Sequence, residues 1–204
     1  VQETLILPLY SRKLCTELYP NLYQDETAVR LIDEIDYDFS EAEKNSRSLM
    51  QRFGALEVAM RQNDLAWEVR NYLKTHPSAA VFFASGVFYY FLTQQVKALV
   101  RGMADAFPGG VLVFDAANRT AVKMIAKTWL RTAKIKDVGA YFAVSDAPKE
   151  IGEWDNRLQV TSRGYMLGYN DLKDPSVSGF FRFLARVGDN GMKMQIVKSG
   201  FGGK

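Results

Sequence analysis

The chain has 204 residues, of which 48% are hydrophobic and 24% charged, and its formal net charge is +3. These proportions are those of a globular protein with one domain, or one domain and an appendage. They exclude a long disordered chain, and the scattered basic residues give no indication of nucleic-acid binding.

The sequence also predicts where the protein works. A single cysteine, Cys15, and a single histidine, His76, can form neither an internal disulfide nor a His/Cys metal site. A lone thiol is typical of the reducing cytoplasm. No apolar run reaches the roughly 18 residues of a membrane span, and the start has no signal-peptide pattern. We therefore expect a cytoplasmic protein with no metal and no membrane partner, and homo-oligomer formation is left open.

Residues 1–50 are predicted to form a helical lid on the substrate side. The stretch 5–18 is mostly apolar, and Asp25 is a suitable N-cap for a short amphipathic helix that reaches Ile35. An acidic and aromatic connection, IDYDFS, follows this helix. Residues 51–204 are then expected to form an α/β domain.

That domain begins with a long helix from about Gly54 to Thr75. His76-Pro77 ends this helix, because proline cannot continue a helix and disfavours the helical conformation of the residue before it. We assign His76 to a capping or surface role rather than to general-base catalysis. The apolar run that starts at Ala79 enters a strand and leads directly into Phe82.

Residues 82–115 are predicted to form a strand, a helix and a second strand, which is one unit of a parallel sheet. Thr93 is expected to cap the helix, and Pro108-Gly109-Gly110 ends it. The second strand ends at Asp115. Ligands of such sheets bind just outside the carboxyl ends of the strands, where Ser85-Gly86 and Asp115 are expected.

The remaining elements are predicted from apolar spacing. They are a helix at 121–133, a turn at 146–148 with a short helix at 150–154, a strand at 158–166, a helix at 177–187 and a strand at 192–201. This order of elements favours an α/β fold.

Several segments together resemble one family. They are ETLILPLYSR at 3–12, AVRLIDEIDYDFS at 28–40, the long helix ending in HP, FFASGVFYYF at 82–91 and FPGGVLVFD at 107–115. They look like the leucine carboxyl methyltransferase-like family, in particular its tetracenomycin-type polyketide O-methyltransferases. The resemblance implies a class I, Rossmann-like fold with a doubly wound, mostly parallel sheet and an antiparallel last strand. It also implies S-adenosylmethionine as cofactor and a small-molecule hydroxyl or carboxylate as acceptor.

The chain departs from the family at Val81-Phe82. The family implies a glycine-rich loop after its first strand and an acidic residue after its second, whereas Val81 here meets Phe82, which looks like the family's fourth strand. Three strand-helix repeats would need about 70 residues. Neighbouring parallel strands also require a crossover of about a dozen residues. Either residues 79–84 form one strand, or a segment is absent from the sequence, and we favour the second alternative. That segment could have been omitted from the sequence or truly deleted from the protein.

The resemblance also implies site residues. Arg61, mid-way along the long helix, corresponds to an arginine that pairs with the carboxylate of the cofactor, and Arg12 could assist it. Ser85 and Gly86 stand near the adenosine and the methyl group, although many family members have an acidic residue in place of Ser85. For each of these residues a surface or turn role is the alternative.

Three tyrosines, Tyr10, Tyr89 and Tyr90, are candidates for lining the acceptor pocket, with core or rim packing as the alternative. Asp115 is assigned to capping of the following helix rather than to catalysis, and no catalytic residue is identified. The predicted function is therefore an S-adenosylmethionine-dependent O-methyltransferase. The alternative is a non-catalytic relative that binds or scaffolds after losing the cofactor loop. A hydrolase is disfavoured because the chain has no GxSxG elbow.

Overall fold

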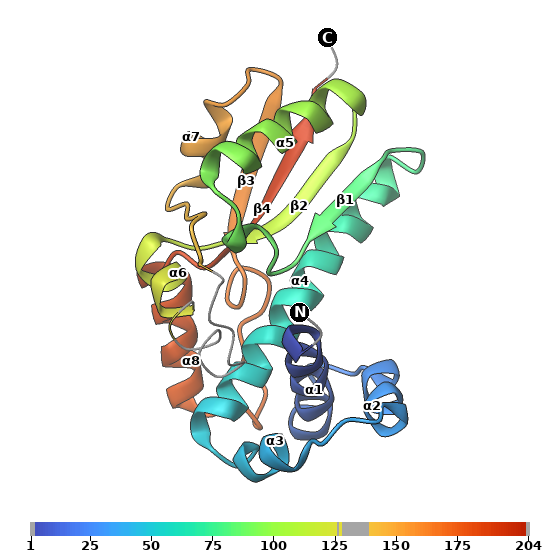
Figure 1. Cartoon of the computed structure of the whole chain (residues 1–204), viewed down its shortest axis with the longest axis vertical. Helices are drawn as coiled ribbons and strands as arrows, with labels where there is room; N and C mark the ends of the chain where they lie inside the picture. The colour runs from blue at the N-terminus through green and yellow to red at the C-terminus, as the bar shows by residue number, and fades with distance from the viewer. Residues whose placement is uncertain (1–2, 126, 128–138, 203–204) are drawn as a thin grey trace.

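The protein has a mixed α/β fold with a four-stranded mixed sheet (Figure 1). The computed structural model describes residues 3–125, 127 and 139–202. The helices and strands in this part, in chain order, are α1 (Glu3–Leu18), α2 (Glu26–Glu34), α3 (Ser40–Asn45), α4 (Leu49–Thr75), β1 (Val81–Ala84), η1 (Phe88–Tyr90), α5 (Thr93–Ala106), β2 (Val111–Ala116), α6 (Arg119–Ile125), α7 (Ala147–Gly152), β3 (Leu158–Gly164), α8 (Gly179–Arg186), the π-helix η3 (Val187–Gly191) and β4 (Gln195–Phe201).

The sheet has the order β1-β2-β4-β3. β1 and β2 are parallel, with Val81 opposite Val111 and Ala84 opposite Phe114, and α5 forms the crossover between them. β4 runs antiparallel to both β2 and β3. The predictions of a strand-helix-strand unit and of an antiparallel last strand are therefore confirmed.

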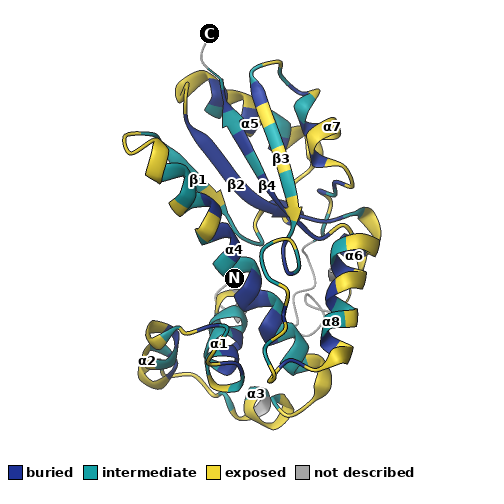
Figure 2. Cartoon of the chain, turned by 180° about the vertical axis from the view of Figure 1, so that it is seen from behind, coloured by how far each residue is buried: buried dark blue, intermediate teal, exposed yellow. Residues whose placement is uncertain are grey.

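The central strand β2 is buried along its whole length, as Figure 2 shows. Val111 and Val113 face the hydrophobic core that contains α1 and α4 residues, whereas Leu112 and Phe114 face the core that contains α5 and α7 residues. Because side chains alternate along a strand, the apolar run in β2 serves both faces of the sheet. Helices thus cover both sides of β2.

The N-terminal helices gather around the first half of α4, at the end of the molecule away from α5 (Figure 1). Asp25 caps α2 as predicted, since its side chain accepts a hydrogen bond from the backbone N–H of Ala28 at 2.9 Å. Cys15 is fully buried in this part, and burial raises the pKa of its thiol to about 12. The thiol is therefore a packing group.

Several helix starts differ from the prediction because a nearby side chain caps the helix better. α4 begins at Leu49, five residues early, with Ser48 as its cap. Thr93 is the first residue of α5 and not its cap, because Gln95 accepts the hydrogen bond of the Leu92 N–H at 2.8 Å.

Other boundaries shift by a few residues. Asp146 caps α7, which begins at Ala147, and Ser178 caps α8, which begins at Gly179. β4 begins at Gln195, three residues later than predicted. The predicted helix at 121–133 is α6 as far as Ile125, and its residues 126 and 128–133 lie outside the described part.

Two single-residue predictions have opposite outcomes. His76 is the C-cap of α4 and stacks on Tyr72 with ring centroids 4.2 Å apart, which confirms the capping role. Asp115, by contrast, does not cap the next helix. The side chain of Asn118 does so, by accepting from the Ala121 N–H at 3.0 Å.

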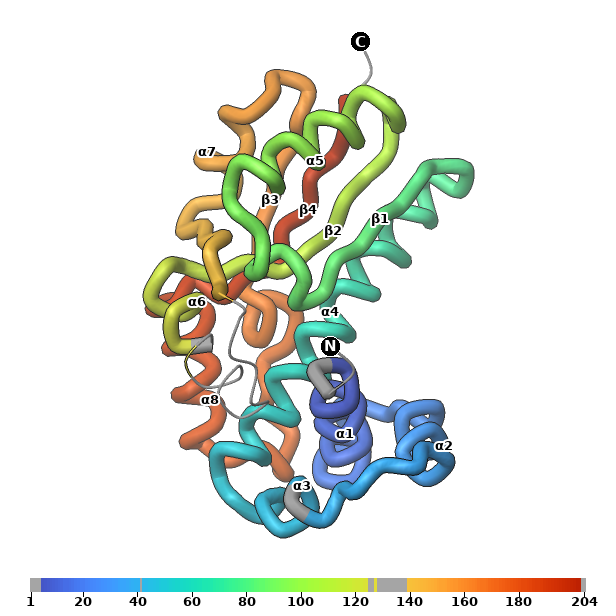
Figure 3. Tube along the Cα trace, viewed as in Figure 1, coloured from blue at the N-terminus to red at the C-terminus, as the bar shows by residue number. Residues whose placement is uncertain are grey.

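Val81 and Phe82 lie in one continuous strand, β1, which corresponds to the first of the two alternatives for this segment. β1 has β2 on one side, and no described strand pairs with its other edge. α4 contacts β1, β2 and β4 on one face of the sheet, and the chain turns from the end of α4 into β1, as the trace in Figure 3 shows. Phe83 is 67% exposed here, which is unusual for a phenylalanine in an uncharged edge strand. Within the described residues, no helix is long and apolar enough to cross a membrane.

Candidate functional site

A buried ion pair joins α4 to the carboxyl ends of β1 and β2. Asp115, near the end of β2, is 1% exposed. Its Oδ1 accepts a hydrogen bond from the Gly86 N–H at 2.6 Å, and its Oδ2 lies 3.2 Å from Nη1 of Arg61. One carboxylate therefore binds the loop after β1 and the long helix together.

The local sequence explains this meeting. Asp115 is two residues after Val113, so its side chain points to the same face of the sheet, toward α4. Gly86 has φ +67°, a left-handed conformation that glycine adopts without strain, and this conformation turns its N–H toward Asp115. A Cβ at this position would lie 3.6 Å from the Arg61 guanidinium.

The electrostatics keep Arg61 charged. Burial acts to lower the pKa of Arg61, but the negative groups around it, Asp115 first, outweigh burial and raise the pKa above its ordinary value. The guanidinium, whose side chain is 19% exposed, is thus a permanent cation in a largely buried position. Its Nε has no hydrogen-bond partner among the described residues. Since buried donors are nearly always paired, this free N–H is a place where a ligand could bind.

Three more polar side chains surround the ion pair. The hydroxyl of Tyr165 donates to Oε1 of Glu57 at 2.9 Å. Tyr89 is 3% exposed, and its hydroxyl has no hydrogen-bond partner in the described part. Burial, and then the nearby carboxylates, raise the pKa of Tyr89 and of Tyr165. Burial likewise raises the pKa of Glu57.

The structure thus brings together some of the residues expected from the sequence. Arg61, Gly86 and Tyr89 meet at this buried ion pair. Ser85, next to Gly86, lines a separate apolar groove of about 170 Å³ between α4 and β1. Tyr90 is half-exposed on η1.

Two expected residues are engaged elsewhere. The Nε of Arg12 donates to Asp25 at 2.8 Å and to the hydroxyl of Tyr23 at 3.3 Å, so its guanidinium fastens α1 to the start of α2. Tyr10 is buried and stacks on Phe39 with centroids 5.5 Å apart. For both, the described contacts are with the N-terminal helices, and their cofactor and acceptor roles stay predictions.

Sequence reasoning missed Glu57, Tyr165 and the role of Asp115. Glu57 lies four residues before Arg61, one helical turn away on the same face, and this spacing could have identified it. Tyr165 lies 108 residues from Glu57, so no local pattern could have linked them.

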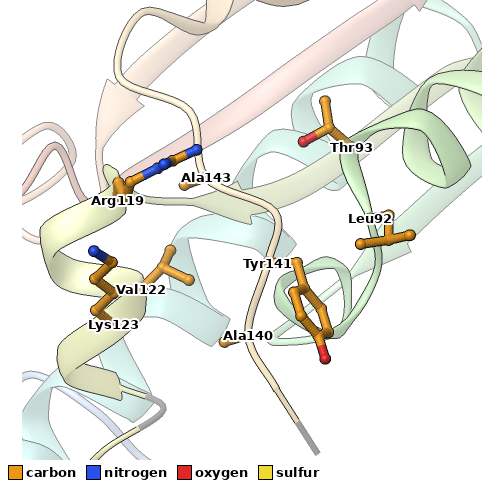
Figure 4. A pocket seen from close by; sticks show the side chains of 8 residues that line it. All are labelled: Leu92, Thr93, Arg119, Val122, Lys123, Ala140, Tyr141 and Ala143. Atoms are coloured by element: carbon orange, nitrogen blue, oxygen red, sulfur yellow. The ribbon is translucent and has the colours of Figure 1, made fainter.

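Apart from the ion pair, the structure has a cavity of about 360 Å³ (Figure 4). Residues from the start of α5, from α6 and from the segment 140–143 line it. The backbone N–H of Tyr141, on that segment, donates to the carbonyl of Tyr89 at 2.7 Å. The wall of the cavity is therefore attached to the short helix η1, which carries Tyr89.

A second buried polar group lies along α4. Asp64 is fully buried, its Oδ1 accepts a hydrogen bond from Asn170 at 3.3 Å, and its Oδ2 has no partner among the described residues. Burial, and then the charge of Asp189, raise the pKa of Asp64 to about 9. We conclude that Asp64 is protonated in the folded protein at neutral pH.

This protonation predicts a pH-dependent effect of Asp64→Asn. Because the folded pKa lies above the unfolded value of about 3.9, the folded chain holds a proton that the unfolded chain releases between these values. Stability therefore falls as pH rises from about 4 toward 9. Asparagine keeps the shape without titrating, so the variant should be more stable than wild type at pH 8 by on the order of 1–3 kcal/mol, and nearly equal to it at pH 5. Urea unfolding at both pH values measures this difference, and an equal difference at both would refute the raised pKa.

In the described part, no group of three or more His, Cys, Asp or Glu side chains is arranged to hold a metal ion. Comparisons with protein-family models, with curated proteins and with solved structures found no match to this chain.

Proposed function

We propose that the protein is an S-adenosylmethionine-dependent O-methyltransferase with a doubly wound, Rossmann-like sheet, acting on a small-molecule hydroxyl or carboxylate. The observation that carries the proposal is the Arg61–Asp115–Gly86 cluster at the carboxyl ends of two parallel strands. This is where ligands of α/β sheets bind. The antiparallel last strand, β4, adds support, because the family resemblance implies one.

The residues present fit one end of the cofactor. A guanidinium has five N–H donors in a fork that suits a carboxylate, and Arg61 makes one hydrogen bond in the described part. Its free Nε and the Gly86 loop are thus suited to the amino-acid end of S-adenosylmethionine.

The residues present do not fit the adenosine end of the cofactor. The described chain has no glycine-rich loop between a strand and a helix and no carboxylate positioned for a ribose diol, so adenosine has no binding site in this part. When bound, the cofactor would supply an activated methyl group for transfer to oxygen. We derive no step of that transfer from the residues in hand.

Within the described residues, no strand pairs with the outer edge of β1, and Phe83 is exposed there. Both features are consistent with the hypothesis that a segment of about 70 residues, absent from this sequence, divides the β1 strand between Val81 and Phe82. Additional strands would pair with this edge and cover Phe83. We expect the intact mass of the natural protein to exceed 23.1 kDa, and a measured mass of 23.1 kDa would show that no residues are absent there.

Arg61→Ala tests the proposed cofactor contact. If the guanidinium binds the cofactor's carboxylate, the variant should lose about 1.5–3 kcal/mol of binding free energy for S-adenosylhomocysteine. Calorimetric titration measures the loss. Lys74→Ala, which removes an exposed cation from the same helix, is the matched control and should bind like wild type. Unchanged affinity of Arg61→Ala would remove Arg61 from the site.

One observation favours a second candidate, a non-catalytic relative that binds or scaffolds. Asp115 already occupies both Arg61 and the Gly86 N–H, so a ligand carboxylate must compete with an internal one. A relative that has lost its cofactor could keep this pair as a structural bond between α4 and the sheet. Lack of binding of S-adenosylmethionine to a folded protein of confirmed mass would favour this candidate.

A further inference from the structure

The cavity between α5, α6 and the segment 140–143 has two chemically different walls (Figure 4). Its volume of about 360 Å³ lies within the usual range for small-molecule pockets. The first wall is α6, which contributes Arg119, Val122 and Lys123. The second is made by Leu92 and Thr93 at the start of α5 and by Tyr141.

The α6 wall is positively charged. Arg119 and Lys123 are four residues apart, so they share one face of the helix, and Figure 4 shows both on the same side of the cavity. Neither side chain forms an ion pair with a described residue. No aspartate or glutamate is among the described residues that line the cavity. Among the described residues, these two positive charges therefore have no neutralising partner.

The rest of the lining is mostly apolar. Leu92, Val122, Ala140 and Ala143 contribute hydrocarbon surface. Tyr141 is 55% exposed and contributes an aromatic ring on which a planar ligand could stack. This combination suits a molecule with an aromatic body and one anionic group.

Hydrogen bonds fix both walls to the fold. The Tyr141 N–H donates to the Tyr89 carbonyl at 2.7 Å, and the Val144 N–H donates to the Ala117 carbonyl at 2.9 Å. At the start of α6, the Asn118 side chain donates to the Gly191 carbonyl at 2.9 Å. The cavity is thus formed by anchored elements from three parts of the chain.

We propose that this cavity binds small aromatic acids, with the anionic group held by Arg119 and Lys123 and the ring placed against Tyr141. Because the Tyr141 N–H donates to the Tyr89 carbonyl, the bound acid is joined through one backbone hydrogen bond to the short helix η1 that carries Tyr89. We further infer that the bound aromatic acid is the methyl acceptor, and this part of the inference rests on the proposed function. The binding itself requires no cofactor.

Fluorescence titration with two naphthalene probes tests the proposal. The full chain, without S-adenosylmethionine, is titrated with 3-hydroxy-2-naphthoate and with neutral 2-naphthol. We expect the acid to bind about tenfold more tightly than the neutral probe, and this advantage to shrink at high salt as the charges are screened. The double variant Arg119→Gln/Lys123→Gln should lose the advantage while binding 2-naphthol as before.

A matched control removes the same two charges elsewhere. Lys44→Gln/Arg47→Gln alters exposed cations in and just after α3, and it should retain the preference for the acid. Tyr141→Ala, on the opposite wall, should weaken the binding of both probes. Circular dichroism confirms that each variant is folded.

Three outcomes would overturn the proposal. They are no binding of the naphthoate, equal binding of the two probes, and unchanged naphthoate binding by the Arg119/Lys123 double variant. Because no titration contains the cofactor, failed cofactor binding leaves this test intact. Conversely, a negative result here leaves the methyltransferase proposal with a different acceptor.

Discussion

Replacing Asp115 with alanine is expected to lower the free energy of unfolding by about 3–5 kcal/mol, because it breaks a buried ion pair from one side. The variant leaves the Arg61 guanidinium without its carboxylate and the Gly86 N–H without its acceptor. Each unpaired buried group costs its own desolvation free energy. The link between α4 and the carboxyl ends of β1 and β2 would then be lost.

Urea denaturation measures this change, and the exposed ion pair of Asp105 with Arg157 supplies a control. Asp105 has a side chain 67% exposed, and its carboxylate lies 2.7 Å from Nη1 of Arg157. Because exposed ion pairs contribute about 0–1 kcal/mol, Asp105→Ala should change stability by no more than that. If the two alanine variants lost the same stability, the Asp115 pair would not be the buried bond described above.

Phe114→Ala is expected to lower the free energy of unfolding by about 3–5 kcal/mol, because core packing is lost. Phe114 is fully buried in β2 and contacts the rings of Phe88 and Phe142, with centroids 5.0 and 6.3 Å away. The residue thus fills the core between the sheet and the α5–α7 side, and alanine would leave a cavity there.

Phe83 is the matched control for Phe114, since it is the same residue type on the neighbouring strand. It is 67% exposed at the free edge of β1, so Phe83→Ala should cost less than about 1 kcal/mol in the 204-residue chain. Thermal or urea unfolding of both variants measures the contrast. A loss at Phe83 as large as that at Phe114 would show that another segment covers the β1 edge.

Much of the fold could be predicted because its signals are local. The β1–α5–β2 unit follows from two apolar runs, a helical spacing and the stop at Pro108-Gly109-Gly110. The Asp25 cap and the end of α4 at His76 depend on one or two residues each.

The candidate site was only partly predictable because its contacts are distant in sequence. The sequence assigns Asp115 to capping, but the alternation of side chains along β2 directs its carboxylate toward Arg61, 54 residues earlier. The resemblance suggests Arg12 as a second cofactor residue, yet in the described structure Arg12 pairs with Asp25. This contact joins α1 to the cap of α2, and the sequence pattern of one helix does not predict which residue of the other it will meet. Sequence patterns predicted the elements better than the pairing of charges between them.

Calorimetric titration of the wild-type protein with S-adenosylhomocysteine tests the proposed function most directly. The methyltransferase proposal predicts saturable binding with a dissociation constant in the micromolar range, equivalent to about −8 kcal/mol. The absence of heat from a folded protein whose intact mass has been confirmed by mass spectrometry would contradict it.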